Sequence, residues 1–193
     1  MPERTTIRPA LLLIDLMNHF DFPGGDALGR QATARVDAII SLRQRFDAND
    51  LPVVYVNDNW TQWRGEFRDL VERCHDNGGA SAVLASRLAP EARHYHVLKP
   101  RHSGFMASAL PALLAQLKVN ALVLAGLASD ACVLATALDA HMRQFRLWVP
   151  SDCSAAQTPA RHDAALRLLR QTTGASTCQA MRRQGCFPET PSS

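Results

Sequence analysis

Several features that mark particular classes of protein are missing from this sequence of 193 residues. No apolar run approaches the roughly 18 residues of a membrane-spanning helix, so we expect no membrane partner. The first six residues lack a basic segment followed by a long apolar one, and we expect no signal peptide. The formal net charge is only +3, with scattered basic residues, which does not indicate a nucleic-acid partner.

The cysteines fit neither a disulfide framework nor a zinc cluster. Their number is odd, and no two of them form a C-x-x-C pair. In a chain of this size, these features indicate reduced thiols in a cytoplasmic setting and argue against structural zinc. The five cysteines are Cys74, Cys132, Cys153, Cys178 and Cys186.

Short apolar runs alternate with helical patterns along the chain. This alternation predicts an α/β fold of three layers, α/β/α, with a mostly parallel, six-stranded Rossmann-like sheet. We expect strands at 10–14, 53–57, 94–98, 121–125, 145–149 and 175–180, and helices at 32–48, 106–116, 131–143 and 159–172. A dinucleotide-binding protein would suit this fold, but DLMNHFDFPGG follows the first strand in place of G-x-G-x-x-G.

The sequence predicts one domain over residues 1–193, without a linker or an internal repeat. Residues 188–193 are expected to be a flexible tail. The less regular segment 58–92 is predicted to supply either a lid or an interface, and its pattern does not decide between them.

Three reactive side chains stand just after predicted strands. Asp15 follows the first strand, Lys99 the third, and Cys132 the fourth after a short turn. Because sites in open α/β sheets form beyond the carboxyl ends of the strands, this topology could bring them together. A helix N-terminus and a lysine would favour a thiolate, and Asp15 could move the thiol proton to a leaving amine. Backbone N–H groups from Gly126 to Cys132 could hold an oxyanion, as acyl transfer requires.

The same residues also have ordinary structural explanations. Free cysteine is often buried as a small hydrophobic residue, and aspartate often caps a turn. A lysine before a proline is common on a surface. Position alone therefore leaves open a structural Cys132, a nucleophile, and a redox sensor that pairs Cys132 with Cys153.

The motifs around these residues resemble those of the isochorismatase-like cysteine hydrolase superfamily, which includes nicotinamidases and N-carbamoyl amide hydrolases. ALLLIDLMNHF resembles the first strand with its catalytic aspartate, here Asp15, and VLKPRHSGF resembles the segment with the catalytic lysine, here Lys99. LAGLASDACVLATALDA resembles the nucleophile segment, with Cys132, and LWVPSDCSAA resembles the strand and acidic loop that follow. The resemblance extends from about Ala10 to Ala180.

This resemblance implies attack by the Cys132 thiolate on an amide carbonyl, with a thioester intermediate. Asp15 would act as general base and then as general acid, while Lys99 would orient it and stabilise the charged pair. A cis peptide bond would join Leu127 and Ala128 and turn the Ala128 N–H towards the oxyanion hole, beside the N–H of Cys132. Isochorismatases that cleave a vinyl ether lack the cysteine, so its presence favours hydrolysis of a C–N bond.

The sequence departs from the Asp-x-His metal motif of nicotinamidases. The corresponding stretch VNDNWTQWRGEF contains Asp58 but has Trp60 where the histidine would be. We therefore predict no metal site and no cofactor, and we do not expect nicotinamide to be the substrate. Residues that could either contact a substrate or simply pack are Phe20, Asn57, Trp60 and Phe105.

The sequence thus predicts a metal-independent hydrolase that cleaves a C–N bond, other than a peptide bond, in a small amide or N-carbamoyl substrate. A non-catalytic binding or assembly module and a thiol redox sensor are the alternatives. The resemblance implies a homodimer or homotetramer, with Trp60, Trp63 and Phe67 as candidates for an interface. The physiological substrate is not determined, because acyl-enzyme chemistry is generic and specificity depends on a few loop side chains.

Overall fold

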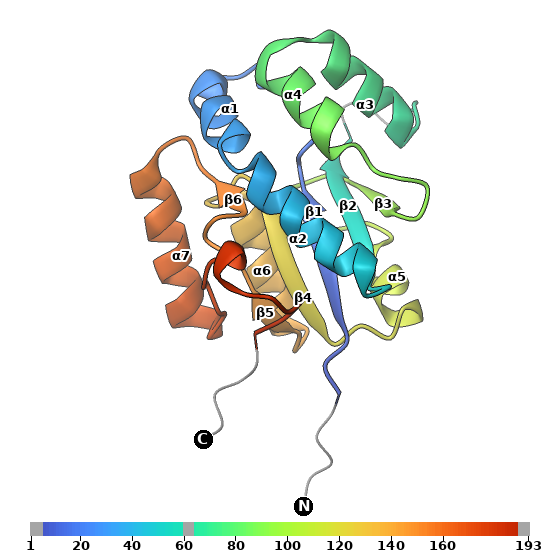
Figure 1. Ribbon diagram of the computed structural model, residues 1–193, viewed down its shortest axis with the longest axis vertical. Helices are drawn as coiled ribbons and strands as arrows, with labels where there is room; N and C mark the ends of the chain where they lie inside the picture. The colour runs from blue at the N-terminus through green and yellow to red at the C-terminus, as the bar shows by residue number, and fades with distance from the viewer. Residues whose placement is uncertain (1–5, 60–63, 189–193) are drawn as a thin grey trace, which may run out of the picture.

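The apolar runs of the sequence form a parallel sheet in the computed structural model, which describes residues 6–59 and 64–188 (Figure 1). The strand order is β3-β2-β1-β4-β5, and β6 also pairs with β4. All these pairs are parallel. The strands are β1 (Pro9–Ile14), β2 (Val53–Asp58), β3 (Tyr95–Lys99), β4 (Ala121–Leu127), β5 (Arg146–Trp148) and β6 (Ser154–Ala155).

Helices cover both faces of the sheet and complete the predicted three-layer α/β/α fold. They are α1 (Gly25–Thr33), α2 (Val36–Ala48), α3 (Phe67–Asp76), α4 (Gly79–Leu88), α5 (Leu110–Gln116), α6 (Cys132–Met142), α7 (Pro159–Thr173) and the 3₁₀ helix η1 (Ala180–Arg182). Successive residues of a strand point to opposite faces. In β1, Leu11 and Leu13 pack with α1 to α4, whereas Leu12 and Ile14 pack with α5, α6 and α7. Figure 1 shows α2 crossing in front of the sheet and α6 behind it.

The register of the central strands places their carboxyl ends at the same edge of the sheet. All six residues of β1 are buried, as expected for a strand that is apolar along its whole length and covered on both faces. Its last residue, Ile14, lies opposite Val56 of β2 and Gly126 of β4. Asp58 of β2 lies opposite Lys99 of β3. Side chains just beyond these ends therefore meet at one edge.

The sixth strand is not the predicted one. Residues 175–180 make a single bridge, between Ser176 and Trp148, and the sixth strand of the sheet is β6. The prediction was wrong because, after Ser176, the chain turns into η1, whose N–H groups donate to the carboxylate of Asp152 instead of extending the sheet.

Some helix boundaries also differ from those expected. The pattern at 32–48 contains the end of α1 and the whole of α2, and the helix expected from 106 begins at Leu110. Segment 58–92 holds α3 and α4, and its role as a lid or an interface stays a prediction. Trp60, Trp63 and most of the predicted tail lie outside the described residues.

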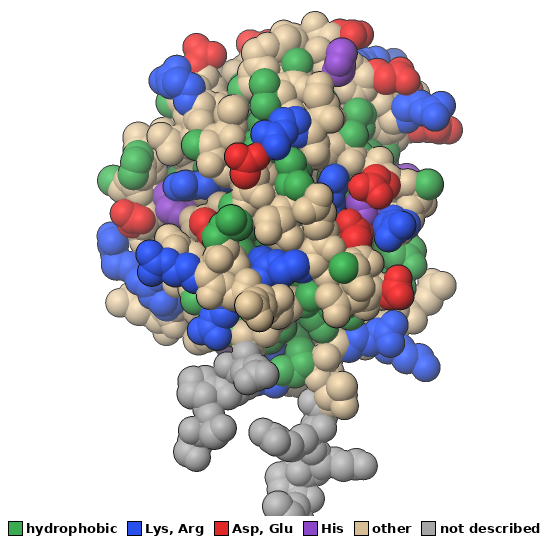
Figure 2. All heavy atoms as spheres, in the orientation of Figure 1, with side chains coloured by type: hydrophobic (Ala, Val, Ile, Leu, Met, Phe, Trp, Pro, Cys, Tyr) green, Lys and Arg blue, Asp and Glu red, His purple; other side chains and the backbone are tan. Residues whose placement is uncertain are grey.

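The surface in Figure 2 carries a mixture of basic, acidic and hydrophobic side chains on the face shown. A nucleic-acid-binding surface would gather basic residues on one face or along one helix. None of the helices in the described ranges is both long and apolar enough to cross a membrane.

Candidate active site

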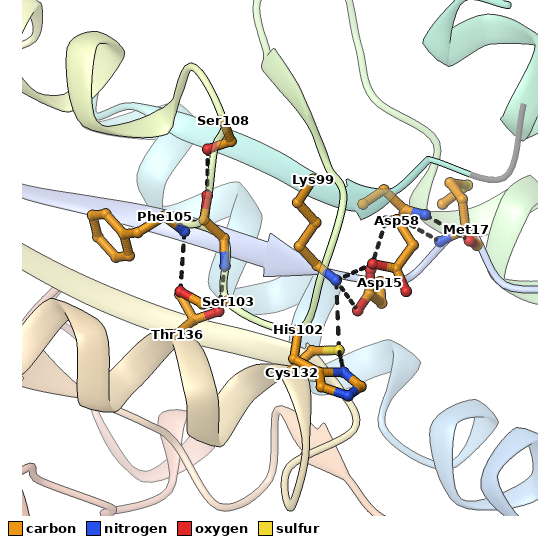
Figure 3. Close-up of polar contacts among 12 residues, drawn as sticks. Asp15, Met17, Asp58, Lys99, His102, Ser103, Phe105, Ser108, Cys132 and Thr136 are labelled. Atoms are coloured by element: carbon orange, nitrogen blue, oxygen red, sulfur yellow. Dashed lines mark hydrogen bonds and ion pairs between the residues drawn. The ribbon is translucent and has the colours of Figure 1, made fainter. Parts of the chain in front are cut away.

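Asp15, Lys99 and Cys132 come together at the carboxyl edge of the sheet (Figure 3). The ammonium nitrogen of Lys99 lies 2.9 Å from Oδ2 of Asp15 and donates a hydrogen bond to Sγ of Cys132 at 3.5 Å. All three residues are buried, and Lys99 is completely inaccessible to solvent. A buried cation paired with a buried carboxylate and a thiol is unusual on structural grounds alone, because each buried charge carries a large desolvation cost.

The backbone turns sharply where Asp15 leaves β1. Its φ angle is 48°, in the left-handed region that few residues other than glycine adopt. Asn57 holds this turn, because its side-chain oxygen accepts a hydrogen bond from the N–H of Met17 at 3.0 Å. The amide nitrogen of Asn57 donates to the carbonyl of Met17 at 2.8 Å. These contacts, both buried, fix the direction in which the Asp15 carboxylate points.

Asp58 is a fourth member of this cluster. Its carboxylate also accepts a hydrogen bond from the Lys99 ammonium, and its backbone N–H donates to Oδ1 of Asp15 at 2.8 Å. Lys99 thus directs its three N–H donors to Asp15, Asp58 and Cys132. The pairing of Asp58 with Lys99 was missed from the sequence, although both stand at the ends of strands that turn out to be neighbours.

The buried environment changes the proton affinities of the cluster. Burial, assisted by the charge of Asp58, raises the pKa of Asp15 to about 6 against the opposing effect of Lys99. Burial disfavours the charged form of Lys99, but the neighbouring Asp15 and Cys132 outweigh it and hold the pKa of Lys99 above its usual value. Burial and the Asp15 carboxylate raise the pKa of the Cys132 thiol. The helix N-terminus and Lys99 were expected to favour a thiolate, but burial and Asp15 outweigh them and favour the neutral thiol. A base must therefore take the thiol proton when the sulfur attacks.

Cys132 is delivered by a tight turn between β4 and α6. Gly126 has a φ angle of 115°, and the Leu127–Ala128 peptide bond is cis, as the family resemblance implied. The carbonyl of Ala128 accepts the N–H of Val133 at 3.1 Å, which closes the turn over the start of the helix. Cys132 is the first residue of α6, where backbone N–H groups lack partners within the helix.

His102 is a further neighbour of the sulfur that the sequence did not reveal. Its Nδ1 atom lies 3.5 Å from Sγ of Cys132, and the residue is exposed. His102 belongs to the stretch VLKPRHSGF, which was matched only for its lysine. Nothing in the sequence indicated that the loop after β3 would bring this ring back to the thiol.

The structure gives the expected pocket residues different surroundings. Phe20 is buried and lines a cavity of about 570 Å³ between α1 and α4, whereas Asn57 uses its amide on Met17. Phe105 packs against the ring of Phe145, with centroids 6.0 Å apart, and points away from Cys132 in Figure 3. Trp60 lies outside the described residues. Contact of these residues with a substrate stays a prediction.

Among the residues that the structure describes, two groups of side chains have the composition of metal ligands. The donor atoms of Asp15, Asp58 and Cys132 lie within 4.8 Å of one another, but the Lys99 ammonium already donates to all three and supplies the positive charge there.

The second group is Asp47, Glu91 and His94. Nδ1 of His94 accepts the N–H of Glu91 at 2.9 Å, so a neutral ring donates from Nε2 to Asp47, also at 2.9 Å. Both ring nitrogens are thereby hydrogen-bonded. This arrangement fits a structural role, in which His94 links Glu91 to Asp47, better than the role of a metal ligand.

Comparison with known proteins identifies the family. The isochorismatase domain model matches residues 9–181, which include every side chain of the cluster. The chain belongs to the isochorismatase family. A curated isochorismatase-family relative, the uncharacterized protein YaaI of Bacillus subtilis, is 32% identical over 160 residues, covering 83% of this chain and 87% of that protein.

Two further similar proteins carry named activities. Maleamate amidohydrolase of Pseudomonas putida is 28% identical over 172 residues, covering 82% of this chain and 78% of that enzyme. The crystal structure of N-carbamoylsarcosine amidase from Thermoplasma acidophilum superimposes with a TM-score of 0.70 at 26% identity, covering 93% of this chain and 100% of that one.

Proposed function

We propose that this protein is a metal-independent cysteine hydrolase that cleaves the C–N bond of a small amide or N-carbamoyl compound through a thioester intermediate. The observation that carries the proposal is the position of Lys99, whose ammonium contacts both the Asp15 carboxylate and the Cys132 sulfur. A base, a cation and a nucleophile in mutual contact are the groups that acyl transfer needs.

In the first half-reaction, the thiol proton passes to Asp15 as the sulfur bonds to the substrate carbonyl carbon. Asp15 then gives this proton to the amine nitrogen, and the C–N bond breaks to leave a thioester on Cys132. The raised pKa of Asp15, about 6, suits it to accept a proton and to return it.

In the second half-reaction, the Asp15 carboxylate takes a proton from water while the water oxygen bonds to the thioester carbon. The C–S bond breaks, Asp15 returns the proton to the sulfur, and the acid is released. Lys99 keeps its proton throughout, because the carboxylates around it hold its pKa above the usual value.

The oxyanion formed at the carbonyl would be stabilised by backbone N–H groups of Ala128 and Cys132. The position of Cys132 at the start of α6 supports this assignment, since N–H groups of a first helical turn point at a ligand and favour negative charge. Their alignment by a rigid turn would contribute to the rate without reorganisation during the reaction.

The relatives and the nucleophile together support this substrate class. Maleamate amidohydrolase, ureidoacrylate amidohydrolase and N-carbamoylsarcosine amidase are all named for C–N hydrolysis of amide or ureido compounds. The Lys99 cation supports the metal-independent form of this chemistry, because its ammonium already contacts the carboxylates that would otherwise face a metal.

The test is a screen of the purified protein against small amides, N-carbamoyl compounds and nicotinamide, with Cys132→Ala as the inactive variant. Removal of the nucleophile should lower kcat by about 10³-fold or more while the thermal transition is retained. Cys178→Ala is the matched control, since this half-buried cysteine lies outside the cluster and should keep full activity. Acid quenching during turnover should also trap a mass increase equal to the acyl group on Cys132.

Substantial turnover by Cys132→Ala would refute the cysteine mechanism. Absence of turnover on every compound, with no acyl adduct, would instead favour the non-catalytic module. A Cys132–Cys153 disulfide after mild peroxide treatment, without turnover, would favour the redox sensor.

A further inference from the structure

The sulfur of Cys132 has polar neighbours from the last residue of β3 and from the loop that follows this strand. Lys99 lies at 3.5 Å from it on the buried side, and Nδ1 of His102 lies at 3.5 Å from an exposed position (Figure 3). The proposed mechanism uses Lys99 and Asp15 and leaves His102 without a task.

The cluster of Asp15, Asp58, Lys99 and Cys132, in which only the Asp58 side chain is partly exposed, has one positive charge too few. With both carboxylates ionised, Asp15, Asp58 and Lys99 together carry a net charge of −1. When the thiol proton moves to Asp15, the negative charge passes to the sulfur and the net charge is unchanged. A thiolate would therefore form beside Asp58 with only Lys99 to compensate both. A second cation in contact with the sulfur would make the cluster neutral and lower the cost of the thiolate.

The loop that carries His102 is fastened to the helix that begins with Cys132. The backbone N–H of Gly104 donates to Oγ1 of Thr136 at 3.0 Å, and Oγ of Ser103 donates to Asp139 at 2.7 Å. Thr136 is completely buried, one turn after Cys132 on α6. These contacts fix the loop relative to the thiol. The backbone beside His102 is therefore held in place, although the residue itself is exposed.

We infer that His102 is a further catalytic residue, whose imidazolium donates its Nδ1–H to the Cys132 sulfur and stabilises the thiolate as Asp15 takes the thiol proton. The inference rests on the proposed function for its role in turnover. The S–H bond breaks, an O–H bond forms on Asp15, and the Nδ1–H bond of His102 stays intact. Histidine is suited to this task because it changes its charge between about pH 5 and pH 8.

Other charged groups lie on the elements that carry His102 and Cys132. They include Arg101, which is exposed, Asp139 of α6, which accepts a hydrogen bond from Ser103, and Asp130 just before α6, which pairs with Arg161. Because an imidazole carries its positive charge only on the acid side of neutrality, the contact should help the thiolate there and contribute less at higher pH.

The experiment measures alkylation of Cys132 by iodoacetamide across pH, followed by peptide mass spectrometry so that the other thiols do not contribute. Because the thiolate is the reacting form, the rate reports thiolate stability without any substrate. At about pH 6.5, His102→Gln should react about 10-fold more slowly than the wild type, and the two rates should converge by about pH 9.5, where the ring is neutral.

A second variant separates charge from structure. His102→Lys keeps a cation at this place up to about pH 10. At about pH 8.5, Cys132 should therefore be alkylated faster in His102→Lys than in His102→Gln, whereas the wild type should by then be close to His102→Gln. His141→Gln, an exposed histidine at the far end of α6, is the matched control and should alkylate as the wild type does.

Equal alkylation rates for His102→Gln and the wild type from about pH 6 to pH 9 would overturn the inference, as would a His102→Lys variant as slow as His102→Gln. If the amide screen fails while the alkylation difference is present, the proposed hydrolysis is wrong and the thiolate contact stands. If the screen succeeds without an alkylation difference, only the role of His102 is wrong.

Discussion

At the scale of single residues, the chemistry depends on how Asp15 balances two opposing environments. Burial and the Asp58 carboxylate favour its protonated form, whereas Lys99 and the hydrogen bonds to Lys99 and Cys132 favour its ionised form. Burial and the Asp58 charge outweigh the opposing interactions, and the pKa of Asp15 is raised to about 6. A carboxyl group with this affinity is a stronger base than an exposed aspartate.

The pH dependence of turnover should report this balance. Because Asp15 must be ionised to accept the thiol proton, kcat/KM should fall about 10-fold per pH unit below about pH 6, instead of below about pH 4 as for an ordinary aspartate. Asp58→Asn removes a charge that raises this pKa, so its acid limb should move to lower pH. Steady-state rates on any amide found active would check this, and a wild-type limb near pH 4 would contradict it.

The residues of the site differ in how far sequence alone could identify them. Asp15 and Cys132 follow apolar strands and Lys99 ends β3, so a parallel topology predicts the edge at which they meet. Asp58 depends on the register that sets it opposite Lys99, and periodicity does not give a register. His102 depends on the path of an irregular loop held by side-chain hydrogen bonds to α6, for which the sequence carried no recognisable signal.

At the scale of elements, Gly126 determines how closely β4 can approach β1. A Cβ atom at this position would lie 2.1 Å from the carbonyl oxygen of Ile14, and the φ angle of 115° is one that residues with side chains rarely adopt. The N–H of Gly126 also donates to the carbonyl of Cys153 at 2.9 Å, which ties the end of β4 to the start of β6. The turn that presents Cys132 thus begins at a position that accepts only glycine.

Gly126→Ala should therefore destabilise the whole sheet. The methyl group would collide with backbone instead of a movable side chain, and we expect a loss of about 3 kcal/mol or more in the free energy of unfolding. Urea denaturation followed by circular dichroism would measure it. Gly185→Ala is the control, because its Cβ would meet only an ordinary contact at 3.6 Å and its φ is not positive. Similar stability for the two variants would show that β1 and β4 can separate at little cost.

The sequence predicted elements best where one simple pattern dominated. Fully apolar runs gave β1, β2 and β4 to within a few residues, because a strand buried on both faces needs apolar side chains at every position. Residues 175–180 were misassigned because their conformation depends on Asp152. This residue lies more than 20 positions earlier and accepts hydrogen bonds from the backbone of η1. Long-range contacts of this kind leave no local periodicity.

At the scale of the whole molecule, the segment after α7 closes one side of the structure. Ser176 exchanges backbone hydrogen bonds with Leu147 and Val149, at 3.2 and 2.8 Å, which covers part of the open edge of β5. Nε1 of Trp148 donates to the carbonyl of Cys178 at 2.9 Å, and Arg45 of α2 donates to the carbonyl of Arg183 at 2.6 Å. Unpaired strand edges invite association with other chains, so this cover protects the edge of β5 from such pairing.

Asp152 should be the residue that holds this cover in place. Its two carboxylate oxygens accept the N–H groups of Ala180 and Met181 at 2.7 and 2.9 Å, so Asp152→Ala leaves both donors without their partner. We expect the free energy of unfolding to fall by about 1–3 kcal/mol. Amide exchange at residues 176–182 should accelerate, while exchange in β1 and β4 stays slow, because opening of this segment does not require the sheet to open. Hydrogen exchange with mass spectrometry would separate the two regions, with Asp21→Ala, an exposed aspartate, as the control. Unchanged exchange at 176–182 in Asp152→Ala would show that Trp148 and Arg45 hold the segment without it.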